Sequence, residues 1–161
     1  MMSIADIEKI KTVLEYMIQY ELDLSDFYKQ CAETCTEEQA LWQNLAHAEV
    51  GHAENIHKMR EIIVKKPERF ELGRPFNPAA LNTATAGLKD YTRRLTSEKF
   101  SFEQILIIAR DIEQSILESH YAEIVKTADI EYQTLMKGIL SDTYVHKRVI
   151  QKKIEEIKTK T

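Results

Sequence analysis

Apolar residues recur along much of this chain at alternating steps of three and four, the spacing of an α-helix with one buried face. The first segment with this spacing runs from about residue 4 to residue 35. Its apolar stripe consists of positions 7, 10, 14, 17, 24, 28, 31 and 35. The series also passes through position 21, which is a glutamate. Glu21 is therefore predicted to lie in the middle of the buried face of a long helix.

A second helix is predicted from about residue 37 to residue 64, with apolar positions 41, 45, 56, 59 and 63. Two polar residues, Glu49 and His52, fill the gap in this stripe. Residues three apart on a helix lie on the same face, so both side chains are expected to point toward the core. A lone buried histidine is usually a hydrogen-bonded core residue. A glutamate one turn before the histidine instead favours a functional pair.

The C-terminal half repeats this arrangement. The sequence "SFEQ" at 101–104 resembles a capping box and opens a helix with apolar positions 102, 105, 106, 109, 112, 116 and 124, among which lies Glu113. The last helix, about 130–157, has its stripe interrupted by Asp142 or Thr143 and then by His146. The two spacings from glutamate to histidine, 21 to 52 and 113 to 146, are nearly equal. Each half therefore reads as a helical hairpin.

Every predicted stripe is interrupted near its middle by a residue type that binds metals. Taken singly, Glu21 or Glu113 could be a charge at the margin of a stripe whose side chain reaches solvent. Taken together, several carboxylates in one core require a shared positive partner, because an unpaired buried carboxylate is costly. No lysine or arginine lies centrally in these stripes. A pair of divalent metal ions would meet the requirement.

The connection between the halves, residues 65–100, is much longer than a tight turn. Its first part, "KKPERFELGRPFNP", reads as extended chain and turns, and "PAALNTATAGLKDYTRRL" reads as a short helix with Pro78 near its start. The chain is long enough for one domain, residues 1–161. These features predict an all-α fold, a four-helix bundle with up-down-down-up topology and one long crossover that contains a short helix.

Composition narrows the possible partners and location. The net charge of −4 gives no reason to expect nucleic acid or an acidic membrane surface as a partner. The longest apolar run, "ILIIA" at 105–109, is too short to cross a bilayer, and the N-terminus lacks the pattern of a signal peptide. We therefore expect a cytoplasmic protein. The only cysteines, Cys31 and Cys35, cannot form a zinc or iron–sulfur site alone and read as small apolar residues on a helix face.

At the level of motifs, the chain resembles the ferritin-like superfamily and, within it, the rubrerythrin-like di-iron carboxylate proteins. The resemblance lies in "YELDLSDFYKQCAE" (20–33), "LWQNLAHAEVGHAENI" (41–56) and "ILIIARDIEQSILESHYAEIV" (105–125). It implies a ferritin-like bundle that binds two iron ions, with manganese or zinc as alternatives. The implied metal ligands are Glu21, Glu49, His52, Glu113 and His146.

One position departs from the family's pattern. A glutamate is expected three residues before His146, and the residue there is Thr143. Asp142 is the substitute that we consider, although its side chain is one methylene shorter. The two metal positions are therefore expected to be unequal, with the one beside Glu49 and His52 better held. Tyr28 and Tyr121 are candidates for hydrogen bonds to the ligands, or else ordinary core aromatics.

The resemblance implies an oxidoreductase that reacts with peroxide or oxygen. The chain has no rubredoxin domain with paired C-x-x-C motifs, so an external electron donor is expected, and the protein is expected to form a homo-oligomer, a dimer. Two alternatives use the same residues differently. One is iron sequestration or metal buffering. The other, suggested by Thr143, is a bundle whose metal site has degenerated and which serves as a structural or interaction module.

Overall fold

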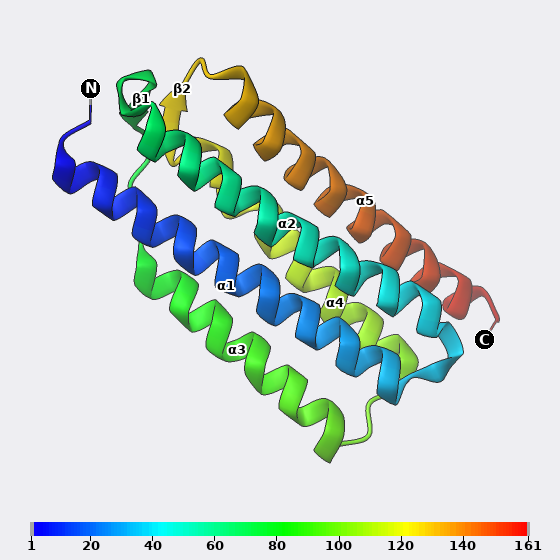
Figure 1. Cartoon of the computed structure of the whole chain (residues 1–161). Helices are drawn as coiled ribbons and strands as arrows, with labels where there is room; N and C mark the ends of the chain where they lie inside the picture. The colour runs from blue at the N-terminus through cyan, green and yellow to red at the C-terminus, as the bar shows by residue number, and fades with distance from the viewer. Residues whose placement is uncertain (1, 161) are drawn as a thin grey trace.

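Five helices account for most of the computed structural model, which describes residues 2–160. They are α1 (Ile4–Thr34), α2 (Gln39–Lys65), α3 (Pro78–Ser97), α4 (Phe102–Leu117) and α5 (Ile130–Lys160). In Figure 1, α1, α3 and α5 run in one direction, and α2 and α4 run in the other. The predicted all-α class is confirmed. Three single turns of 3-10 helix, Thr36–Glu38, Pro67–Arg69 and Tyr121–Glu123, lie in the connections.

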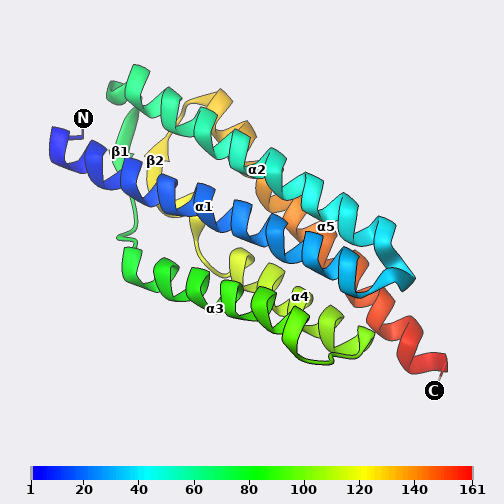
Figure 2. The ribbon, with the colours of Figure 1, turned by 60° about the horizontal axis from the view of Figure 1, so that its bottom comes forward.

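The long helices pack side by side along most of their length. Helix α1 packs against α2 and α3, α5 packs against α4, and α2 also contacts α5. Figure 2, turned relative to Figure 1, shows α3 lying along α1. Helix α3 begins at Pro78, as the sequence predicted, and its 20 residues extend two residues beyond the predicted segment 78–95. Its fully buried positions, Leu81, Leu88 and Leu95, form a single narrow stripe. The crossover therefore covers one side of α1 and leaves most of its own surface in solvent.

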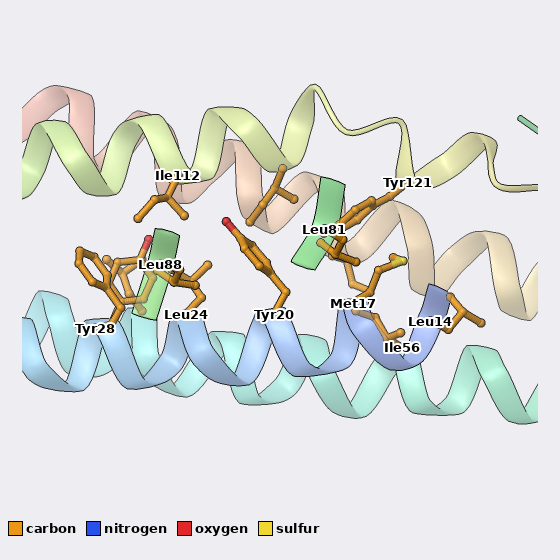
Figure 3. Close-up of a cluster of buried hydrophobic side chains, with 14 of the residues drawn as sticks. Leu14, Met17, Tyr20, Leu24, Tyr28, Ile56, Leu81, Leu88, Ile112 and Tyr121 are labelled. Carbon is orange, nitrogen blue, oxygen red and sulfur yellow. The ribbon is translucent and has the colours of Figure 1, made fainter. Parts of the chain in front are cut away.

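The inner faces of the helices are apolar and closely packed. Leu14, Met17 and Leu24 of α1 and Ile56 of α2 are fully buried. Figure 3 shows Leu24 and Tyr20 projecting from α1 toward α4. Apolar burial of this kind is the main force that brings such helices together. Within residues 2–160, no helix combines the length and the apolar character needed to cross a membrane.

A small sheet, which the sequence did not predict, joins the connection between α2 and α3 to the connection between α4 and α5. Strand β1 (Phe70–Leu72) pairs antiparallel with β2 (Val125–Thr127), and Phe70 lies opposite Thr127. The chain then passes so closely that a Cβ atom on Gly73 would lie 2.1 Å from the carbonyl oxygen of Glu123. Strands of three residues are too short to produce a readable alternation of apolar and polar positions. The hydrophobic pattern therefore could not reveal them.

Helix α4 ends earlier than predicted. The apolar series extended to position 124, but α4 ends at Leu117. His120 then adopts a left-handed backbone with φ of 62°, which interrupts the helix. Tyr121 and Ile124 are nevertheless buried, because the turn before β2 folds back onto the core. The sequence pattern thus predicted correctly that this end of the apolar series is buried, and wrongly that it is helical.

Side-chain caps fix the starts of α4 and α5, two of the helices that carry candidate ligands. The predicted capping box at α4 is present, with the N–H of Gln104 donating to the hydroxyl of Ser101. At α5, the carboxylate of Asp129 accepts a hydrogen bond from the N–H of Tyr132 and pairs with Arg69 at 3.1 Å. These caps satisfy N–H groups that would otherwise lack partners.

Candidate metal centre

Two groups of ligand-type side chains meet in the interior and share Glu49. We call Glu21, Glu49 and His52 the His52 group, and Glu49, Glu113 and His146 the His146 group. In each, one donor atom from every residue lies within 4.8 Å of the others. Helices α1, α2, α4 and α5 all contribute. The structure thus brings the five residues singled out from the sequence into one place.

In the His52 group, the imidazole is held on both sides. Its Nδ1 lies 2.9 Å from an oxygen of Glu49 and 4.0 Å from an oxygen of Glu21. Its Nε2 lies 3.0 Å from Oδ2 of Asp142 on α5. A carboxylate on the outer ring nitrogen fixes the tautomer and leaves the inner nitrogen to act as a ligand. The geometry therefore makes His52 Nδ1 the donor that faces the carboxylates.

In the His146 group, the carboxylate is the fixed member. The hydroxyl of Tyr28 donates a hydrogen bond to Oε1 of Glu113 at 2.5 Å. Nδ1 of His146 lies 3.1 Å from Glu49 and 3.5 Å from Glu113, but no partner satisfies hydrogen-bond geometry. The rings of His52 and His146 stack with centroids 5.7 Å apart. The two imidazoles therefore lie next to each other, and each approaches a different oxygen of Glu49.

The positions of Asp142 and Thr143 are the reverse of what the sequence suggested. Asp142, the expected substitute ligand, belongs to neither group; its side chain is 60% exposed, and it contacts the outer nitrogen of His52. Thr143 is the residue that fills the stripe of α5, fully buried, with its hydroxyl donating to the carbonyl oxygen of Ile139. The buried face of α5 thus presents a neutral side chain where the family pattern has a carboxylate.

Burial leaves several carboxylate oxygens without a partner. Glu21, Glu49 and Glu113 are completely buried. Both oxygens of Glu21, one of Glu49 and one of Glu113 accept no hydrogen bond. Orphaned buried polar atoms are rare in proteins, and a cluster of them calls for an explanation. Carboxylate oxygens and an imidazole nitrogen that converge on one place, several of them without a hydrogen-bond partner, match a site built for a cation.

The charges in the cluster shift the pKa values of its carboxyl groups in different directions. Burial, reinforced by the charge of Glu49, raises the pKa of Glu21 well above its usual value. The same causes raise the pKa of Glu113 to about 7. Burial would also raise the pKa of Glu49, but His146 and His52 outweigh it and lower that pKa below its usual range. The shared ligand is therefore the carboxylate that stays ionised most readily.

The histidines respond to these carboxylates in turn. Burial alone would lower the pKa of His146, but Glu113 and Glu49 raise it to about 10. Glu49 and Asp142 likewise raise the pKa of His52 against the effect of burial. Without a cation, protons thus offset the negative charge of the cluster. A divalent ion would replace those protons, because it binds deprotonated ligands.

Two tyrosines were candidates for hydrogen bonds to the ligands, and the structure shows such a bond for one of them. Tyr28 contacts a ligand directly, as described above. Tyr121 is buried, but within residues 2–160 no hydrogen bond links it to a glutamate. Sequence reasoning passed over Tyr20, whose ring projects from α1 toward α4 (Figure 3). Burial first, and then the charges of Glu21 and Glu113, raise the pKa of its phenol. Its position beside Glu21, off the apolar series, gave no signal in the sequence.

Comparisons with known proteins do not assign the chain to a family. No protein-family model, curated protein or solved structure matches the chain. The buried groups of glutamate and histidine could hold a metal ion, and this conclusion depends only on the arrangement of the side chains.

Proposed function

We propose that this chain is a ferritin-like protein of rubrerythrin type, which binds two divalent metal ions and reduces peroxide or oxygen. The observation that carries the proposal is the sharing of Glu49 by two ligand groups, each with its own histidine and its own further glutamate. One bridging carboxylate with one imidazole on either side is an arrangement for two ions rather than one.

The order of the helices supports the same proposal. The ligands come from two helix pairs, α1 with α2 and α4 with α5. Helix α3 connects the pairs along the chain and lies along the outer side of α1 (Figure 1). If α3 is counted as the crossover, the remaining four helices have the up-down-down-up order of a ferritin-like bundle. In that fold class, metal sites are built in the core from side chains on facing helices.

Iron is the metal that we favour. Carboxylates are hard ligands that suit the ferric state, and imidazole suits the ferrous state, so three carboxylates and two imidazoles serve both. Manganese and zinc accept the same ligands. A pair of ferrous ions would supply the two electrons that peroxide needs to form water.

Thr143 favours reaction with a small anionic or easily ionised oxidant. Three carboxylates leave one positive charge of two divalent ions unbalanced. The buried neutral side chain of Thr143 adds no charge and less bulk than a glutamate. The remaining charge would attract an anion, and deprotonated peroxide meets that description. The loss of a ligand from α5 thus becomes a position for substrate.

The chain's own residues have separable roles in this proposal. Glu49 joins the two positions, and Asp142 orients the imidazole of His52 by accepting from its outer nitrogen. Tyr28 fixes one oxygen of Glu113 and leaves the other free to bind. Apolar side chains such as Leu24 exclude bulk water from the cluster. Exclusion of water strengthens every electrostatic contact within the site.

The test combines metal analysis with single turnover. Protein freed of metal is titrated anaerobically with Fe(II), and one equivalent of hydrogen peroxide is then added while ferric absorbance is followed. We expect two ions per chain and oxidation of both by one peroxide. Two ions per chain without reaction would point to sequestration or buffering instead. Failure to bind any divalent ion would overturn the proposal and favour the degenerate-site alternative.

Metal loading should also stabilise the fold. Ions that bind only the folded state add about 2.7 kcal/mol at one hundred times their dissociation constant. For a chain of this size, that corresponds to an increase in Tm of roughly 5 to 10 °C. Thermal unfolding followed by circular dichroism, with and without chelator, measures the shift. An unchanged Tm would count against a metal site.

A further inference from the structure

A continuous row of buried, oxidisable side chains leads away from Glu113 toward the end of α1. It begins at Tyr28, whose hydroxyl donates to Glu113 at 2.5 Å. The Tyr28 ring stacks on the indole of Trp42 in α2, with centroids 5.9 Å apart and an angle of 24° between the rings. Trp42 lies beside the thiol of Cys35, and Cys31 is one turn before Cys35. All four residues of the row are buried.

Ordinary core packing does not account for the polar atoms of this row. The buried indole N–H of Trp42 interacts with the Cys35 sulfur and with no oxygen acceptor among residues 2–160. The Cys35 thiol donates to Oε2 of Glu37, an exposed residue, at 3.4 Å. Buried donors normally have acceptors, and a buried thiol that only fills space needs no carboxylate. Tyrosine, tryptophan and cysteine are the side chains that lose one electron most readily, and here Tyr28, Trp42 and Cys35 connect the ligand cluster to the exposed Glu37.

The backbone holds Cys31 and Cys35 close enough for a disulfide to span their Cα atoms. Cys35 caps α1 with φ of −122° and ψ of 86°, outside helical geometry, while its N–H still donates to the carbonyl oxygen of Cys31 at 2.8 Å. Four residues at 1.5 Å rise separate their Cα atoms by about 6 Å, within the range that disulfides span. Because Cys35 has left the helix, the usual objection to a disulfide between residues four apart on a helix does not apply.

We propose that Cys31 and Cys35 are an internal two-electron donor for the ligand cluster and that Trp42 and Tyr28 conduct the electrons. This inference rests on the proposed function. The two thiols lose two electrons and two protons, and one S–S bond forms. Peroxide at the cluster accepts the electrons, its O–O bond breaks, and two water molecules form with the two protons. The proton of Cys35 passes through the exposed Glu37 to solvent, the Cys31 proton is likewise released, and solvent returns two protons to the peroxide oxygens, so that protons and electrons balance.

The pair then serves once until an external dithiol reduces the disulfide by thiol exchange. Burial and the nearby Glu37 raise the pKa of Cys35 to about 11, so direct attack of this thiol on peroxide is slow, because the thiolate is the reactive form. Oxidation by way of the cluster is therefore distinguishable from direct oxidation. The first requires bound metal, and the second does not.

The experiment counts thiols rather than turnover. Reduced, Fe(II)-loaded protein receives excess peroxide anaerobically, the reaction is stopped with acid at set times, and free thiols and intact mass are measured after unfolding. We expect both thiols to be lost, with a mass decrease of two hydrogen atoms and no dimer. Metal-free protein should lose its thiols at least about tenfold more slowly.

Two pairs of variants test the route. Trp42→Phe keeps an aromatic ring in the core but is much harder to oxidise, and Tyr132→Phe is the control, a buried tyrosine that packs on Phe70 instead. We expect thiol loss to slow about tenfold or more in the first and to be unchanged in the second. If Trp42→Phe does not fold, the exposed Glu37→Gln, compared with the exposed Glu33→Gln, tests the proton acceptor without touching the core.

The outcomes separate this inference from the function on which it depends. If the protein binds two ions and consumes peroxide while its thiols stay reduced, the thiol donor is wrong and the proposed function stands. If thiols are lost equally fast without metal, or equally fast in Trp42→Phe and Glu37→Gln, the route through Trp42 is wrong. If no metal binds, the proposed function itself fails.

Discussion

The His52 group and the His146 group share Glu49 but are held in opposite ways. In the His52 group, the imidazole is fixed by Asp142, whereas neither oxygen of Glu21 has a hydrogen bond. In the His146 group, the carboxylate of Glu113 is fixed by Tyr28, whereas His146 Nδ1 is unpartnered and its side chain is 12% exposed. Each position thus combines one oriented donor with one that is free to move.

This difference indicates that the two positions are not equivalent copies. An oriented ligand loses less conformational freedom on binding, and a free one can change its mode of coordination during a reaction. The free donor nearest the surface is an imidazole, and the free donor deepest in the core is a carboxylate. Substitutions should therefore affect the two groups separately, except at the residue that they share.

The largest effect is expected at that shared residue. In Glu49→Gln a neutral amide replaces the one carboxylate that both groups use, so affinity should fall at least about 100-fold at both positions. Isothermal titration with Fe(II) or Co(II) measures this. Glu54→Gln, on the exposed face of the same helix, is the matched control and should bind like the original protein. Loss of only one ion in Glu49→Gln would show that the groups do not share a ligand.

Asp142→Ala should weaken one position alone. Removal of the partner on the outer nitrogen of a metal-binding histidine typically lowers affinity about 10- to 100-fold. Because Asp142 contacts His52, the loss should appear in a His146→Ala background, where only the His52 group can bind. It should be absent in a His52→Ala background. Asp111→Ala, an exposed aspartate on α4, is the control. If the loss instead appears in the His52→Ala background and is absent in the His146→Ala background, Asp142 is a ligand of the His146 group.

Thr143→Glu tests whether the neutral face of α5 is a defect or a substrate position. A fourth carboxylate completes the charge of two divalent ions, so metal affinity should rise about tenfold. The same carboxylate would occupy the position proposed for peroxide, so oxidation of bound Fe(II) by peroxide should slow. Thr143→Val, similar in size, should change neither. Tighter binding together with faster oxidation would contradict the assignment of this position to substrate.

The ligand cluster was predictable from sequence to the extent that helix periodicity determines which face is buried. Glu21, Glu49 and His52 lie in apolar stripes whose spacing leaves no choice of face, and Glu113 and His146 do so as well. The choice between Asp142 and Thr143 could not be made in the same way. Successive residues on a helix are 100° apart, so either could have faced the core, and the rotation of α5 decides. That rotation depends on tertiary contacts.

The connections were less predictable than the helices. The pairing of β1 with β2 and the end of α4 at Leu117 depend on contacts between segments far apart in the sequence. The stacking of Tyr28 on Trp42 likewise joins two helices whose relative register the sequence does not specify. Single-helix patterns thus located the donors, while the contacts that orient them required the fold.

The smallest effect that we expect concerns pH, and it separates the metal-free cluster from the loaded one. The pKa of Glu113 is raised to about 7 and that of His146 to about 10 in the folded protein. A raised pKa contributes stability that is fully present below the group's ordinary value and is lost as pH rises through the folded value. The contribution of Glu113 therefore declines between about pH 4.5 and about pH 7, and that of His146 between about pH 6.5 and about pH 10. Together they amount to roughly 1 to 3 kcal/mol.

Bound metal should reverse this trend, because ligands must lose their protons to bind and affinity rises with pH. Urea unfolding of both forms across that range measures the two slopes. Glu113→Gln removes one of the titrating groups and should flatten the decline of the metal-free protein. If metal-free stability instead rises with pH, the carboxylates are ionised without a cation, and the protons that we assign to the cluster are not there.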